Sequence, residues 1–188
     1  MYSLTKNKTW IYQEENFLTE EENKNVMDLG NFQNLELGGL GAGKINESVR
    51  NSFISWINID EKSQWLYTKV SDKINQVNNN HYNFELFDFE VFQFAGYFEH
   101  NQGRYGPHSD SSGLSNPMRK LSIIILLSDD SDFEGGELCF YVNGSSYVFK
   151  NVKNSFIAFP SFLIHQVTPV TKGSRYSLVS WVRGPQFK

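Results

Sequence analysis

The chain has 188 residues, and its 17 basic and 21 acidic side chains give a formal net charge of −4 at pH 7. This length suits one domain with a core of its own and is short for two. The negative charge, without any long run of basic residues, argues against nucleic acid as a partner, because such binding depends on phosphate contacts with lysine and arginine. No apolar stretch approaches the roughly 18 residues that span a bilayer, so no membrane insertion is expected.

A single cysteine, Cys139, excludes a disulfide within the chain, and the amino terminus lacks the charged and apolar regions of a signal peptide. We therefore expect a reducing, cytoplasmic location. Cys139 itself is interpreted as a small buried thiol on the opposite side of its strand from Leu138 and Phe140.

Residues 1–85 are expected to form a helical support region that includes short strands. Thr19 followed by Glu22 is a capping box, which predicts a helix that starts near Thr19. A second helix is indicated by apolar residues at spacings of three and four, with Asp60 as a candidate cap and Asn78–Asn80 as its end. These apolar residues are Leu66, Val70, Ile74 and Val77.

From residue 86 the hydrophobic pattern changes to a period of two, which predicts strands because alternate side chains of a strand share a face. Asn143-Gly144 between two such segments indicates a tight hairpin. We expect a single domain over residues 1–188, mainly β with flanking N-terminal helices (α+β), whose core over 86–184 is a double-stranded β-helix, or jelly roll. The candidate strands are 86–99, 104–109, 119–128, 137–142, 146–150, 155–159, 164–170 and 175–183.

His108-Ser109-Asp110 places an imidazole and a carboxylate two residues apart, on one face if the segment is a strand. His165 lies in a largely apolar segment, where an unpaired polar ring would carry a desolvation cost. Together the three side chains form the two-histidine, one-carboxylate ligand set of non-haem Fe(II) oxygenases. The alternatives are a surface pair in a turn for His108 and Asp110, and a core histidine bonded to a backbone carbonyl for His165.

Arg175 begins a second polar pattern on a predicted strand. Alternation places four residues on one face, and they are Arg175, Ser177, Val179 and Trp181. A buried guanidinium needs an anion, and this region offers no obvious carboxylate. A carboxylate from a bound ligand would meet that need, with the Ser177 hydroxyl beside it. The alternative is a rim residue paired with an acidic side chain.

These residues, in this order, resemble the Fe(II)/2-oxoglutarate-dependent dioxygenases, and within them the prolyl 4-hydroxylase-like group, over roughly residues 45–184. Further segments carry the resemblance: Arg50-Asn51-Ser52 as an R-x-S motif, Tyr97 to His108, Arg119 to Ser128 followed by Gly135 to Phe140, and Trp181 six residues after Arg175.

The resemblance implies that His108, Asp110 and His165 bind Fe(II) and form the catalytic centre, with 2-oxoglutarate and O2 as co-substrates and ascorbate as an optional further cofactor. By the same resemblance, the residues that bind 2-oxoglutarate are Arg175, Ser177, Tyr97, Leu126 and Leu138, and the residues that bind substrate are Arg50 and Trp181. Leu126 departs from the family pattern, because several members have a tyrosine at that position.

The implied function is hydroxylation of prolyl residues in a peptide or protein, with oxidative decarboxylation of 2-oxoglutarate to succinate and CO2. The alternatives are the same chemistry on a free amino acid, a small metabolite or an alkylated nucleic acid, and a non-catalytic jelly-roll binding module. Nucleic-acid demethylation is disfavoured by the negative charge of the chain. The demethylases of this superfamily also carry a second arginine at a fixed short offset after the first, whereas here the next arginine, Arg183, lies eight residues after Arg175. The physiological substrate and the oligomeric state are left open.

Other conspicuous residues are expected to lie outside the metal site. His81 and His100 are interpreted as turn or loop residues, and Asp129–Asp132 as a solvated loop over the site entrance, because it lacks the further ligands of a calcium loop. The glycine-rich run 37–44 has the spacing of neither nucleotide-binding motif and is interpreted as a surface loop. The tryptophans expected to be core or packing residues are Trp10, Trp56 and Trp65.

Overall fold

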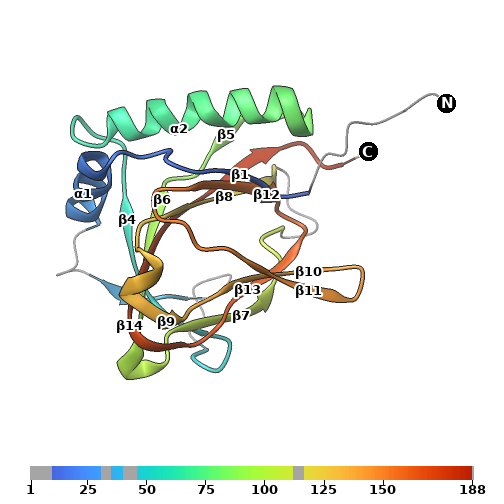
Figure 1. The fold of residues 1–188 in the computed structure, drawn as a ribbon. Coiled ribbons are helices and arrows are strands. Elements are labelled where there is room, and N and C mark those ends of the chain that lie inside the picture. The colour runs from blue at the N-terminus through green and yellow to red at the C-terminus, as the bar shows by residue number, and fades with distance from the viewer. Residues whose placement is uncertain (1–9, 31–34, 40–45, 112–116, 188) are drawn as a thin grey trace.

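Two antiparallel sheets face each other in the computed structural model, which describes residues 10–30, 35–39, 46–111 and 117–187 (Figure 1). The helices are α1 (Glu20–Leu29) and α2 (Gln64–Val77). The strands of the larger sheet are β1 (Tyr12–Glu14), β2 (Glu36–Leu37), β4 (Phe53–Ile57), β5 (Asp88–Phe89), β6 (Phe92–Phe98), β8 (Met118–Leu126), β9 (Phe133–Gly135), β12 (Phe156–Pro160) and β14 (Val170–Gly184). Those of the smaller sheet are β3 (Arg50–Asn51), β7 (Arg104–His108), β10 (Leu138–Val142), β11 (Ser145–Phe149) and β13 (Ile164–Val167).

The strand order is β1-β12-β8-β14-β6-β4-β2 in the larger sheet, where β5 and β9 also pair with β14, and β11-β10-β13-β7-β3 in the smaller sheet. Both helices pack on the outer face of the larger sheet (Figure 1). This mainly β architecture with flanking N-terminal helices confirms the predicted fold class. The expectation of a single domain over residues 1–188 stays a prediction.

The predicted strand segments all contain strands, because period-two alternation persists wherever one face of a segment is buried. β14 begins at Val170, earlier than predicted, and β13 ends at Val167. The short strand β9 has no counterpart among the predictions. The N-terminal region contributes β1 to β4, which join the same two sheets as the later strands.

Helix α1 begins where the capping box predicts. The Thr19 hydroxyl accepts a hydrogen bond from the backbone N–H of Glu22 at 3.1 Å, and the Glu22 carboxylate accepts one from the backbone N–H of Thr19 at 2.8 Å. These reciprocal bonds satisfy two donors that the first turn of a helix otherwise leaves open.

Helix α2 differs from the expectation at its start. Its N-cap is Ser63, so the prediction of Asp60 is wrong; the Asp60 carboxylate instead accepts the backbone N–H groups of Lys62 and Ser63, both at 2.9 Å, in the turn before the helix. The α-helix ends where predicted, with Asn78 as its C-cap. A π-helical turn then continues to Tyr82 and ends at Asn83, whose φ of 57° is left-handed.

Strand β8 separates the two apolar layers. Ile123 and Ile125 belong to the core between the helices and the larger sheet, whereas Ile124 and Leu126 belong to a smaller cluster between the two sheets. Both faces of β8 are therefore covered, which explains its nearly continuous apolar sequence. The space between the sheets also holds the polar residues described below.

Two of the three tryptophans expected to be core or packing residues lie outside the core. Trp10 and Trp56 are 55% and 47% exposed, and Trp10 packs by an edge contact with Phe162. Trp65 packs partly buried against the helix–sheet core. A large side chain shields a core only where a strand or helix directs it inward, and the sequence around Trp10 and Trp56 does not reveal that direction.

Two further expectations concern membrane-spanning helices and the glycine-rich segment 37–44. In the described segments, no helix combines the length and the apolar character that crossing a bilayer requires. The predicted surface loop at 37–44 lies largely outside the described residues, and its first residue, Leu37, belongs to β2.

Candidate active site

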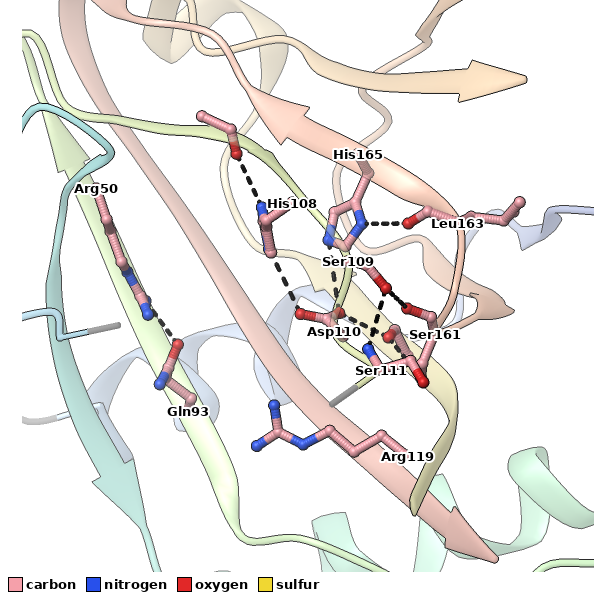
Figure 2. A network of polar contacts seen from close by, with 12 residues as sticks. Arg50, Gln93, His108, Ser109, Asp110, Ser111, Arg119, Ser161, Leu163 and His165 are labelled. Carbon is pink, nitrogen blue, oxygen red and sulfur yellow. Dashed lines mark hydrogen bonds and ion pairs between the residues drawn. The ribbon is translucent and has the colours of Figure 1, made fainter. Parts of the chain in front are cut away.

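Three side chains of the predicted ligand set converge between the sheets (Figure 2). His108 ends β7 and lies opposite His165 of β13 in the antiparallel register, while Asp110 follows in the next turn. The Asp110 carboxylate oxygens lie 3.4 Å from His108 Nε2 and 3.5 Å from His165 Nε2. The three ligand atoms are all within 4.8 Å of one another. Asp110 lies past the end of β7, so the turn, and not strand alternation, brings its carboxylate beside His108.

Both imidazoles are oriented by their second nitrogen. Nδ1 of His108 lies 2.9 Å from the Gly106 carbonyl oxygen, and Nδ1 of His165 lies 3.0 Å from the Leu163 carbonyl oxygen. Since a carbonyl can only accept, each Nδ1 carries the proton and each Nε2 has its lone pair directed toward Asp110. This is the arrangement by which ligating histidines are held for a metal.

A serine network holds the Asp110 carboxylate and its turn. The Ser122 hydroxyl donates to Asp110 Oδ2 at 2.6 Å and lies 3.0 Å from the Ser161 hydroxyl. The Ser161 carbonyl accepts three bonds at 3.0 Å, from the backbone N–H groups of Asp110 and Ser111 and from the Ser109 hydroxyl. The turn that carries Asp110 is thereby tied to the segment that leads into β13.

The pKa values of two of these side chains favour the forms that bind a metal. Burial alone would raise the pKa of Asp110, but the adjacent His165 and His108 and the Ser122 hydroxyl outweigh it and hold the pKa well below its usual value. Burial lowers the pKa of His165 below its ordinary value, against the opposing effect of Asp110. An ionised carboxylate and a neutral imidazole are the ligand forms that a divalent cation requires.

Beside these residues, a cavity contains a buried cation, Arg175, that forms no ion pair with any described carboxylate. Arg175 is 1% exposed, and burial lowers its pKa. Its Nη1 donates to the Ser177 hydroxyl at 3.3 Å, whereas Nε and Nη2 have no hydrogen-bond partner in the part of the chain that the structure describes. The ring centre of Tyr97 lies 5.3 Å from the guanidinium carbon. A buried guanidinium in this state is suited to an anionic ligand.

The predicted face of β14 lines this cavity together with the three candidate ligands. The four residues of that face are Arg175, Ser177, Val179 and Trp181. Of the other residues assigned to 2-oxoglutarate, Tyr97 and Leu138 line the cavity, and Leu126 does not. Leu126 instead packs in the cluster between the sheets, and Ile124, two residues earlier on the same face of β8, lines the cavity.

The residues assigned to substrate, Arg50 and Trp181, both line the cavity. The Nε, Nη1 and Nη2 of Arg50 donate to the Ser52 hydroxyl, the Gly39 carbonyl and the Gln93 side chain at 2.8, 3.1 and 2.7 Å. These bonds hold the guanidinium in place but do not use all of its N–H groups, so substrate contact by Arg50 stays a prediction.

Trp181 differs from Arg50, because its buried indole Nε1 has no partner among the described residues. Its ring is covered by the Arg119 guanidinium at 3.8 Å, which the Glu90 carboxylate holds through two bonds at 2.7 and 2.6 Å. The position of the indole is thus fixed from outside the cavity, and its N–H remains available to a ligand.

None of the other conspicuous residues lies in the cavity lining. His81 contacts the rings of Tyr12 and Tyr82, His100 stacks on Phe98, and Cys139 is buried, as expected of a structural thiol. Asp129–Asp132 forms a capped 3₁₀ turn outside this lining, so the expectation of a loop over the site entrance is not supported.

No sequence pattern in this chain points directly to the serine network. Ser122 and Ser161 are fully buried, and Ser122 interrupts the apolar run from Leu121 to Leu126 in β8. A buried hydroxyl needs a hydrogen-bond partner, so a serine within an apolar run is the one local signal that could have marked it.

The side chains present fit both an iron ion and 2-oxoglutarate. Two imidazole nitrogens and one carboxylate oxygen make up the donor set of a facial Fe(II) site. The unpaired nitrogens of Arg175, in the same cavity, match the geometry of a carboxylate, which a guanidinium can bind through two parallel bonds.

Comparison with known proteins agrees with this donor set. The family model of the 2OG-Fe(II) oxygenase superfamily matches residues 92–183, a range that contains the three candidate ligands and Arg175. PKHD-type hydroxylases of Idiomarina loihiensis and Picosynechococcus sp. are 36% identical over 85 residues and 37% identical over 79 residues. These matches cover 45% and 42% of this chain but 39% and 36% of the relatives, so the chain spans less than two fifths of the curated relatives it matches.

Solved structures share the fold over nearly the whole chain. A prolyl hydroxylase from Trichoplax adhaerens, in complex with a peptide fragment of the hypoxia inducible factor oxygen degradation domain, has a TM-score of 0.80 at 20% identity, covering 95% of this chain and 85% of that one. A Pseudomonas putida prolyl-4-hydroxylase has a TM-score of 0.76 at 22% identity, covering 93% and 92%. This similarity confirms the predicted jelly roll.

The family match over residues 92–183, the PKHD-type relatives and the shared fold together support a 2OG-Fe(II) oxygenase that is prolyl 4-hydroxylase-like. That family implies Fe(II), 2-oxoglutarate and O2 as cofactor and co-substrates.

Proposed function

We propose that this protein is a Fe(II)- and 2-oxoglutarate-dependent dioxygenase that hydroxylates prolyl residues of a peptide or protein. The observation that carries the proposal is the unpaired Arg175 guanidinium, buried in the same cavity as the cluster of His108, Asp110 and His165. When bound by these three ligands, iron supplies the activation of O2 for C–H hydroxylation, coupled to decarboxylation of 2-oxoglutarate to succinate and CO2.

The remaining residues bind and orient the co-substrate. Arg175 and the Ser177 hydroxyl are suited to the distal carboxylate of 2-oxoglutarate, and Tyr97 and Leu138 form walls of the same cavity. The carboxylate would enter a site from which water is largely excluded, where a charge-assisted bond is stronger than at the surface. Its length and two acidic ends let 2-oxoglutarate contact Arg175 and the metal together.

The charge of the cavity favours an internal residue of a polypeptide over a free amino acid or a nucleotide. Among the described lining residues, the charged or ionisable groups other than tyrosine are Arg50, His108, Asp110, His165 and Arg175. Each nitrogen of Arg50 already donates to a protein acceptor, and the others are assigned to metal and 2-oxoglutarate. No cation or carboxylate is then left in that lining to pair with a free amino or carboxyl group or with a phosphate.

An uncharged prolyl ring suits the apolar and aromatic groups that remain, which include Tyr105, Val179 and Trp181. The Trp181 N–H can donate to a backbone carbonyl of the substrate, which a peptide supplies. A peptide or protein partner, ascorbate as an accessory reductant and a cytoplasmic location complete the proposal; the last rests on the single cysteine.

The test is an anaerobic titration of the purified protein with Fe(II) and 2-oxoglutarate, followed by visible absorption spectroscopy. We expect a charge-transfer band of the metal–co-substrate chelate in the wild type and none in His165→Ala. Folded wild-type protein without this band would refute the enzyme assignment. Succinate release with a panel of proline-containing peptides, and mass spectrometry for addition of one oxygen atom, then test the substrate. Turnover only with free amino acids, small metabolites or alkylated nucleic acid would replace the prolyl assignment.

A further inference from the structure

The two candidate histidine ligands are held in different ways. The His165 side chain is 6% exposed and lies against the rings of Phe159 and Phe140, with ring centres 4.8 and 6.0 Å away. The His108 side chain is 16% exposed, and its Nδ1 bond to Gly106 fixes the ring at one point. A second contact is needed to fix the plane of the His108 imidazole.

Tyr105 provides that contact. Its ring lies parallel to the His108 imidazole, with ring centres 3.6 Å apart and an angle of 13° between the planes. Burial raises the pKa of Tyr105, so its phenol stays neutral over the ordinary pH range. The stack is the closest ring pair described in this structure, and it determines how the imidazole can rotate about its Nδ1 hydrogen bond.

Tyr105 is in turn held by Arg50. The two residues are paired across β3 and β7, and the Arg50 guanidinium carbon lies 4.6 Å from the centre of the Tyr105 ring. Arg50 is 5% exposed and bonded through all three nitrogens, to Ser52, Gly39 and Gln93. Figure 2 shows Arg50 directed toward Gln93, with the three candidate ligands to one side. A cation fixed in this way beside an aromatic ring restricts the ring in turn.

We propose that Arg50 and Tyr105 are positioning residues that hold the His108 imidazole in the orientation needed to bind the metal. The proposal rests on the proposed function, because it presumes a metal at His108, Asp110 and His165. Ligand rings must be held within about 0.5 Å and 10–20° of the productive geometry, and outer contacts of this kind are what hold them. An arginine that is bonded through all three nitrogens and packed against the Tyr105 ring suits this role.

The experiment measures metal binding rather than turnover, with Co(II) as a probe whose visible spectrum reports coordination geometry. Tyr105→Phe retains the ring and should keep Co(II) affinity close to that of the wild type. Tyr105→Leu removes the stack and should lower the affinity about 10- to 100-fold, with an altered spectrum. Arg50→Lys retains the charge but not the three-way fork of bonds, so a smaller loss is expected. If Tyr105→Leu does not fold, the Co(II) affinity of Arg50→Lys tests the proposal instead.

Arg104→Met is the matched control. Arg104 neighbours Tyr105 on β7 and bonds to the Glu47 carbonyl at 3.1 Å, away from the cavity lining. Its replacement should leave the Co(II) affinity and spectrum unchanged. The 2-oxoglutarate affinity at saturating metal should also stay unchanged in the Tyr105 and Arg50 variants, because Arg175 is intact.

The two proposals fail in distinguishable ways. Wild-type protein that binds neither Co(II) nor 2-oxoglutarate would overturn the proposed function and this inference with it. Wild type that binds both, together with Tyr105→Leu and Arg50→Lys variants that bind Co(II) equally well with the same spectrum, would overturn the positioning role alone. In that case any loss of peptide turnover in the variants would assign Tyr105 and Arg50 to substrate binding.

Discussion

Replacing Arg175 by methionine should weaken 2-oxoglutarate binding without destabilising the ligand-free protein. In the structure, Arg175 is fully buried, and Nε and Nη2 have no hydrogen-bond partner among the described residues. An unsatisfied buried donor costs about 1–3 kcal/mol. Methionine retains most of the apolar stem and removes both donors, so the free energy of unfolding of the ligand-free variant should be equal to that of the wild type or higher by about 1 kcal/mol.

The same substitution should weaken the binding of 2-oxoglutarate. Two charge-assisted hydrogen bonds to a carboxylate contribute about 1.5 kcal/mol each at the lower end of their range. A loss of about 3 kcal/mol lowers affinity roughly 100-fold, since about 1.4 kcal/mol corresponds to a factor of ten. At a 2-oxoglutarate concentration near 100 times its dissociation constant, the wild type gains about 2.7 kcal/mol of stability, and the variant should gain almost none.

The assay is thermal and chemical unfolding with and without 2-oxoglutarate, combined with anaerobic titration for affinity. Arg183→Met is the control, because Arg183 lies on the same strand but forms an exposed ion pair with Asp88 at 2.8 Å. Its substitution should change stability by less than about 1 kcal/mol and leave 2-oxoglutarate affinity unchanged. An Arg175→Met variant that is markedly less stable without ligand, or that binds 2-oxoglutarate as tightly as the wild type, would refute the reasoning.

Two further predictions concern the candidate metal ligands. Ser122→Ala removes the 2.6 Å bond to Asp110 and should lower Fe(II) affinity by about 10-fold or more in anaerobic titration, with unchanged circular dichroism; unchanged affinity would contradict a role for the serine network. The metal-free protein should lose stability as pH falls below about 6.5. Burial lowers the pKa of His165 in the folded protein, so the unfolded chain takes up a proton in this range that the folded chain does not. Thermal unfolding between pH 7 and 5 checks this prediction. His165→Asn should reduce the dependence of the melting temperature on pH, and a wild-type melting temperature that rises on acidification would contradict the sign of the effect.

The parts of the fold that could be predicted from the sequence are those fixed by local patterns. Thr19 and Glu22 form their capping box from contacts within one turn, and strand geometry alone places Arg175, Ser177, Val179 and Trp181 on one face of β14. Asp60 failed as a helix cap because its carboxylate accepts the backbone N–H groups of Lys62 and Ser63 in the turn before the helix. The N-cap is Ser63, whose side chain makes no capping bond, so capping propensity alone does not locate the first residue of the helix.

In the candidate site, the three ligands and Arg175 have side chains whose chemistry is conspicuous in the sequence. The residues that support them have side chains of ordinary types, which the sequence does not single out. Ser122 reaches Asp110 only because the pairing of β8 and β12 and the turn after β7 bring them together. Arg50 carries a charge that suggests a ligand contact, and only the structure reveals its bonds to Gln93 and Ser52. Such assignments depend on contacts distant in sequence, which no local pattern encodes.

The candidate site requires a fixed number of residues in the long strand β14. Val170–Gly184 pairs with β6 and β8 on either side, and its register with them places alternate residues from Arg175 to Trp181 toward the cavity. Insertion or deletion of one residue between Arg175 and Trp181 would turn one end of this face outward, because side chains alternate strictly along a strand. Substitutions can therefore accumulate in β14 while its length stays constant, and changes in length are confined to the loops at its ends.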